Sequence, residues 1–92
     1  MIEEITRAVL KLVDQYPITK VTLFGSRADG TNRGDSDIDL IMEFKIPVSL
    51  LTLSMIRIEL EEMLGIKVDL VHGPVTSADI IEIKKEIVLY AA

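Results

Sequence analysis

Apolar residues recur along the chain with two periods, one typical of helices and one typical of strands. Across residues 2–16 they return every third or fourth position, which predicts an amphipathic helix that ends before Pro17. Residues 18–24 are rich in β-branched side chains and lead directly into Gly25, which predicts a first strand. Residues 37–44 alternate between apolar and mainly acidic positions, which predicts a second strand with one face in the core.

The second half of the chain predicts a similar succession of helices and strands. Ser49 is a suitable N-cap and Gly65 a suitable C-terminal glycine, so the two bracket a predicted helix over residues 50–64. A third strand is predicted over residues 67–71. Ser77 is predicted to cap a short helix that runs through residues 82–84. Residues 87–90 predict an edge strand, and the alternative is that they continue the preceding helix. With a short helix over residues 26–30, this order predicts one α/β (α+β) domain, residues 1–92, with a small mixed sheet flanked by helices.

The predicted helix over residues 50–64 carries more apolar side chains than one buried face requires. Its predicted core stripe consists of Leu53, Ile56, Leu60, Met63 and Leu64. The apolar residues outside that stripe are Leu50, Leu51, Met55 and Ile58. Such an excess indicates either a partner surface or packing under a neighbouring loop or terminal segment, and the sequence leaves both readings open.

Composition narrows the classes of function. The net charge of −5 argues against direct binding of nucleic acid by this chain, because the phosphate backbone requires a basic surface. The absence of cysteine excludes disulfides and thiolate zinc sites. No apolar run is long enough to cross a membrane, and the first residues lack the pattern of a signal peptide, so a cytoplasmic location is predicted.

Two polar signals stand at the facing ends of the first two predicted strands. Gly25 and Ser26 follow the first strand, and Asp37 and Asp39 open the second. Each signal alone has an ordinary explanation, since Gly-Ser is a common turn and Asp-x-Asp a common solvated start of a strand. If the two strands pair antiparallel, however, the signals converge, which favours a shared function.

The convergence has a chemical meaning. Side chains two residues apart on a strand share a face, with Cα atoms roughly 6.5–7 Å apart, so the carboxylates of Asp37 and Asp39 repel each other unless a cation lies between them. Such oxygen ligands suit Mg²⁺, and phosphate oxygens can complete its coordination. Gly25 and Ser26 would offer backbone N–H groups to an anion. Metal and phosphate together predict a nucleoside triphosphate as ligand.

Two arginines lie in the segment between the two signals. Arg27 falls in the predicted short helix over residues 26–30, and Arg33 falls in the polar loop over residues 31–36. Either residue is a solvated loop charge or a contact to the triphosphate, for which guanidinium geometry is well suited.

At Gly25-Ser26 and Asp37-x-Asp39 the chain resembles the DNA polymerase beta-type nucleotidyltransferases. In length and order of elements the whole chain resembles the minimal nucleotidyltransferase (MNT) proteins, many of which are the antitoxin halves of HEPN/MNT toxin–antitoxin pairs. That superfamily uses a third carboxylate on a later strand. Asp69 lies in the predicted strand over residues 67–71, and its parity turns it away from the core, toward the face of Asp37 and Asp39 if the strands are neighbours.

The resemblance implies a domain of the order α-β-α-β-α-β-α and the transfer of AMP from ATP to a hydroxyl group. The implied acceptor is a tyrosine of a cognate helical HEPN RNase toxin, which the modification silences, so the chain would act as an antitoxin. The resemblance also implies that Asp37, Asp39 and Asp69 are catalytic and hold Mg²⁺, with two ions, and that Gly25 and Ser26 bind phosphates.

Two other functions are alternatives to this one. One is a non-catalytic antitoxin that neutralises a helical partner by occlusion. The other is a catalytic subunit that acts on a small molecule or nucleic acid presented by a separate subunit. Three aspartates together with Gly-Ser favour an enzyme, because a pure binding module has no need for mutually repelling carboxylates. A homo-oligomer is compatible with each of these functions.

Overall fold

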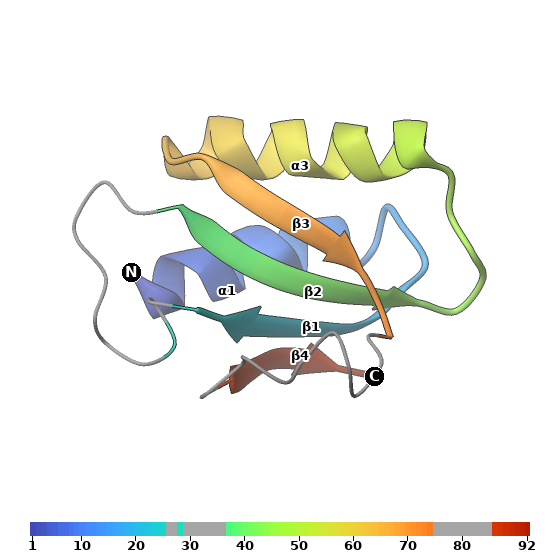
Figure 1. Cartoon of the computed structure of the whole chain (residues 1–92), viewed down its shortest axis with the longest axis horizontal. Coiled ribbons are helices and arrows are strands. Elements are labelled where there is room, and N and C mark those ends of the chain that lie inside the picture. The colour runs from blue at the N-terminus through green and yellow to red at the C-terminus, as the bar shows by residue number, and fades with distance from the viewer. Residues whose placement is uncertain (26–27, 29–36, 75–85) are drawn as a thin grey trace.

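The computed structural model of the chain describes residues 1–25, 28, 37–74 and 86–92. In this part of the chain, two helices cover one face of a four-stranded mixed sheet (Figure 1). The helices are α1 (Ile2–Leu12) and α3 (Leu50–Leu64), and the strands are β1 (Ile18–Phe24), β2 (Ile38–Phe44), β3 (Val68–His72) and β4 (Glu86–Ala91). The predicted mixed α+β architecture is therefore confirmed. The short helices predicted over residues 26–30 and 77–84 and the loop over residues 31–36 lie outside the described residues, apart from Ala28, which is helical and buried.

The strands lie side by side in the order β3-β2-β1-β4. β1 runs antiparallel to both β2 and β4, whereas β2 and β3 are parallel and are joined by the crossover through α3. The last strand lies at the edge of the sheet, so the prediction of an edge strand is confirmed and its helical alternative is wrong. No helix in the described part of the chain is both long and apolar enough to cross a membrane.

The core lies between the two helices and the sheet. Alternation along β2 places Ile38, Leu40 and Met42 in this core, each with 0% of its surface exposed. Helix α3 contributes Ile56 and Leu60, which are also fully buried. The side chains that complete the core cluster come from α1, β1 and β3 and include Ile5, Val9, Leu12, Val21, Leu23 and Val68.

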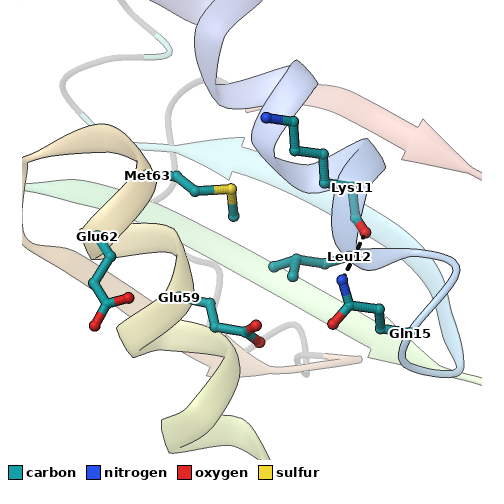
Figure 2. A pocket seen from close by; sticks show the side chains of 6 residues that line it. All are labelled: Lys11, Leu12, Gln15, Glu59, Glu62 and Met63. Atoms are coloured by element: carbon teal, nitrogen blue, oxygen red, sulfur yellow. Dashed lines mark hydrogen bonds between the residues drawn. The ribbon is translucent and has the colours of Figure 1, made fainter.

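Two predictions about the helices are wrong in detail. Helix α1 ends at Leu12 rather than near residue 16, because the N–H groups of Gln15 and Tyr16 both donate to the Leu12 carbonyl and close a turn. Met63, predicted to be in the core stripe of α3, is 40% exposed. It lines a cavity of about 270 Å³ between the two helices, where longer polar side chains, including Lys11, take the place of close apolar packing (Figure 2).

Both ends of α3 have the predicted caps. At the start, the Ser49 hydroxyl accepts a hydrogen bond from the Thr52 N–H at 3.1 Å, which satisfies one of the free donors of the first turn. At the end, Gly65 adopts a left-handed conformation with φ of 68°, which a residue without a side chain adopts at little cost. The crossover helix therefore begins and ends where the sequence indicates.

A side chain of α3 fastens the start of β3. The Glu61 carboxylate accepts a hydrogen bond from the Val68 N–H at 2.8 Å through one oxygen and from Arg57 at 3.1 Å through the other. The bond to Val68 satisfies a backbone donor at the end of a parallel strand and links that strand to the last turn of the helix. Glu61 thus fixes the position of the residue directly before Asp69.

We expect Glu61→Ala to lower the free energy of unfolding by roughly 1–3 kcal/mol, because the Val68 N–H loses its partner in a partly buried position. The measurement is urea denaturation at neutral pH. Glu61→Gln is the matched control, since its amide oxygen can still accept the bond, and it should lose less than half as much. Equal losses in the two variants would assign the effect to the ion pair with Arg57 instead.

Candidate active site

Two of the three predicted aspartates are direct neighbours in the sheet. In the parallel pairing of β2 with β3, Asp39 is the partner of Asp69. Partner residues on adjacent strands project from the same face with Cα atoms about 5 Å apart. Since Ile38 and Val68 point into the core, both carboxylates project from the opposite face, away from α1 and α3.

The third aspartate precedes β2. Asp37 is exposed and lies two residues before Asp39, so the spacing places its side chain on the same face. Further along that face, Thr22 and Ile41 are partners across β1 and β2 and are only 4% and 5% exposed. The aspartates therefore gather at the accessible end of the face, where β2 begins.

Asp39 has an altered affinity for protons. Partial burial raises the pKa of its carboxyl above the usual range, and the negative charges of Asp69 and Asp37 raise it further. A cation bound among the three groups would reverse this effect, because it would favour the carboxylate over the acid.

Gly25 makes room for the Asp39 carboxylate. Its φ of +75° lies in the left-handed region, and a Cβ atom placed there would stand 2.5 Å from Asp39 Oδ2. The pairing of Phe24 with Asp39 across β1 and β2 brings the two residues together. The predicted convergence of the glycine with the Asp-x-Asp segment is thus observed for Gly25 and Asp39. Ser26, Arg27 and Arg33 lie outside the described residues.

The donor set suits a hard cation that also has ligands from elsewhere. Among the described residues, no three carboxylate, imidazole or thiol side chains approach closely enough to enclose a metal ion on their own. Asp39 and Asp69 nevertheless offer adjacent oxygen donors, with Asp37 beside them. Mg²⁺ is commonly held by one or two carboxylates together with phosphate oxygens and water, so these residues fit such an ion.

Two supporting contacts were not predicted from the sequence. The Glu61–Val68 bond carried no signal, because a glutamate four residues after an arginine resembles an ordinary surface pair. The packing of Gly25 against Asp39 is implied by antiparallel pairing of the two strands, whereas the sequence alone indicates only phosphate contact for this glycine. Both contacts act on the positions of the aspartates.

A family model and several relatives match this chain over most of its length. The nucleotidyltransferase domain family matches the chain over residues 2–91. MJ1217 of Methanocaldococcus jannaschii, which is assigned by name to the protein adenylyltransferases, is 36% identical over 87 residues, 88% of this chain and 89% of that relative. The protein adenylyltransferase MntA of Thermococcus cleftensis is 37% identical over 71 residues, 76% of this chain and 72% of that relative.

Solved structures share the fold. A structure described as a minimal nucleotidyltransferase has a TM-score of 0.72 at 32% identity, with 89% of this chain and 86% of that chain covered. A toxin–antitoxin complex with AMP-PNP has a TM-score of 0.78 at 20% identity, covering 95% of this chain and 73% of the other. The MNT antitoxin bound to a tri-AMPylated HEPN toxin of Shewanella oneidensis has a TM-score of 0.76 at 20% identity, covering 100% of this chain and 74% of the other.

Gly25→Ala should displace the Asp39 carboxylate and lower stability by more than backbone strain alone. Gly65→Ala is the matched control, because its φ of +68° is nearly the same as the +75° of Gly25, while a Cβ at residue 65 would meet nothing within 4 Å. We expect a loss of about 1–2 kcal/mol for Gly65→Ala and a clearly larger loss for Gly25→Ala. Urea denaturation of both variants gives the difference. Equal losses would show that the contact with Asp39 imposes no constraint.

Asp39→Asn should stabilise the metal-free protein at pH 7. The folded pKa of Asp39 is raised above the ordinary value of 3.8, so its contribution favours folding when the group is protonated and is lost as the pH rises through the folded pKa. The gain from the uncharged amide should therefore be largest at neutral pH and should vanish as the pH falls toward 3.8. Urea denaturation across this range, in a chelator, measures it. Asp14→Asn, at an exposed site after α1, is the control and should show no such trend.

Proposed function

The chain belongs to the nucleotidyltransferase domain family and is an enzyme of this kind, and on that premise we propose that it transfers AMP from ATP to a hydroxyl group of a partner protein. Support comes from relatives named protein adenylyltransferases and from the fold shared with an antitoxin in complex with an AMPylated toxin. The single observation that carries the proposal is the pairing of Asp39 with Asp69 on the accessible face of the sheet.

The aspartates have separate roles in the proposed reaction. Asp37 and Asp39 would hold Mg²⁺ against the triphosphate, and Asp69 would hold a second ion with Asp39. Two bound ions would neutralise the charge of the triphosphate and lower the pKa of the attacking hydroxyl. The raised pKa of Asp39 supports this assignment, because carboxylates that repel one another in the free protein gain most from bound cations.

The reaction is an in-line displacement at the α-phosphorus. The hydroxyl oxygen of the acceptor forms a bond to that phosphorus while the bond from phosphorus to the bridging oxygen of the β-phosphate breaks, and pyrophosphate leaves. Asp69 accepts the hydroxyl proton; it is exposed at the end of the sheet, where an acceptor on another macromolecule can reach it. Gly25, together with Ser26, would bind the β- and γ-phosphates through backbone N–H groups.

The proposed acceptor is a tyrosine of a cognate HEPN-type toxin, which makes the chain an antitoxin. The exposed position of Asp69 on the edge strand β3 suits an acceptor hydroxyl that another folded protein presents. The structural likeness to antitoxins in HEPN toxin complexes supports this choice of partner. The cytoplasmic location expected from the sequence stays a prediction.

With labelled ATP, Mg²⁺ and the HEPN partner, we expect label on the partner at a tyrosine. Asp39→Asn and Asp69→Asn should each reduce transfer at least about 100-fold, because each removes a carboxylate that would hold the Mg²⁺ ions, and the ions would stabilise the negative charge of the transition state. A chelator should abolish it. Transfer is measured by scintillation counting and the modified residue by mass spectrometry, and Asp14→Asn should retain full activity.

The same variants separate the competing functions. If the Asp39→Asn chain still neutralises the toxin as well as the original chain does, occlusion rather than transfer is the mechanism. If the label appears on a small molecule or a nucleic acid instead, the proposed acceptor is wrong while the nucleotidyltransferase chemistry stands.

A further inference from the structure

Helix α3 has a second apolar face, which no described residue of the chain covers. The exposed fractions are 83% for Leu50, 72% for Leu51, 49% for Met55 and 45% for Ile58. At 3.6 residues per turn, the last three fall within an arc of about 60°, on the side opposite the buried Ile56 and Leu60. We call Leu51, Met55 and Ile58 the outer stripe of α3.

The outer stripe is separated from the aspartates by the body of the domain. The sheet lies between them, because the carboxylates project from the face opposite α3. In Figure 1, α3 runs along the β3 side of the molecule with its outer side free of other described elements. Strand β2 begins at Ile38, beside Asp39, and leads away from it toward Ser49, the N-cap of α3. A molecule bound to the outer stripe would leave the active site accessible.

The charges of α3 are arranged unfavourably for the helix on its own. Its first turn contains no acidic residue and its last turn no basic residue, so neither end of the helix dipole is balanced by a side chain of the opposite sign. Residues 50–56 carry no charge at all, while Glu59, Glu61 and Glu62 gather near the negative C-terminal end. A partner that placed acidic groups beside the start of α3 would balance the positive end of the dipole, and an uncharged surface beside its last turn would add no further negative charge there.

We propose that the occupant of the outer stripe is a second copy of this chain, with the two α3 helices packed antiparallel about a two-fold axis. An antiparallel copy supplies the missing complement, since its acidic last turns lie beside the uncharged, positive first turns of its neighbour. A parallel copy would instead place glutamates beside glutamates. The two helix dipoles also oppose each other in the antiparallel arrangement.

The spacing of the outer stripe fits this symmetry. If the two-fold axis passes beside Met55, this residue contacts Met55 of the partner subunit, and Leu51 contacts Ile58 of the partner subunit. Glu62 then lies beside the start of the other α3, near Ser49 of the partner subunit. Each contact is repeated by the axis, as an isologous interface requires. Because α3 is only about 22 Å long, the contact is small, and dimer formation should depend on concentration in the micromolar range.

The first test is sedimentation velocity of the full chain over a range of concentrations. The original chain should form a dimer, and Leu51→Glu and Met55→Glu should each raise its dissociation constant at least about 30-fold, because a charge would be buried against an apolar surface. Leu10→Glu is the matched control: Leu10 lies on α1, is 45% exposed and should leave the dimer unchanged. Circular dichroism of each variant checks that it is folded.

The second test uses the absence of cysteine from the chain. Met55→Cys introduces one thiol at the predicted axis, and mild oxidation should join two chains by a disulfide, whereas Leu10→Cys should stay largely monomeric under the same conditions. A chain that remains monomeric at all concentrations overturns the proposal, as does equal cross-linking of the two cysteine variants. If Leu51→Glu abolishes binding of the HEPN partner while the original chain alone is monomeric, the outer stripe belongs to that partner instead.

Discussion

The parallel pairing of β2 with β3, which sets Asp39 beside Asp69, is the constraint on which the rest of the structure depends. It brings together two groups that repel each other; burial raises the pKa of Asp39, and the charge of Asp69 raises it further. The opposite face of the same two strands supplies the compensation. On that face Ile38, Leu40 and Val68 are buried almost completely. Their burial stabilises the pairing register of β2 and β3, which the repulsion between the carboxylates destabilises.

A parallel pair also requires a crossover, and α3 provides it with its ends fixed. The helix begins at the Ser49 cap, ends at Gly65 and is tied to β3 by the bond between Glu61 and the Val68 N–H. A slip of β3 by one residue would turn Asp69 into the core and expose Val68, so these local bonds and the hydrophobic pattern specify the same register. The crossover thus aligns residues that lie thirty positions apart in the sequence.

Much of this arrangement could be predicted from the sequence because it depends on local patterns. The two-residue period of β2 separates Asp39 from Leu40, and capping chemistry marks both ends of α3. What could not be predicted depends on contacts between distant segments. The exposure of Met63 and the anchoring role of Glu61 follow from how two helices and a strand meet, which no local period encodes. The parity of Asp69 was predictable, but its place directly beside Asp39 needed the order of the strands.

The single layer of helices explains how so small a chain can divide its surface by function. Both described helices cover one face of the sheet, so the aspartates project from the other face, at the end where β2 begins. Helix α3, on the β3 side, buries one stripe and exposes the other, and its apolar outer stripe faces away from the aspartates. The outer stripe and Asp39 therefore lie on opposite sides of one domain. Glu61 links α3 to β3 directly before Asp69 but is not part of the outer stripe, so substitutions of Leu51 or Met55 should leave the carboxylates in place.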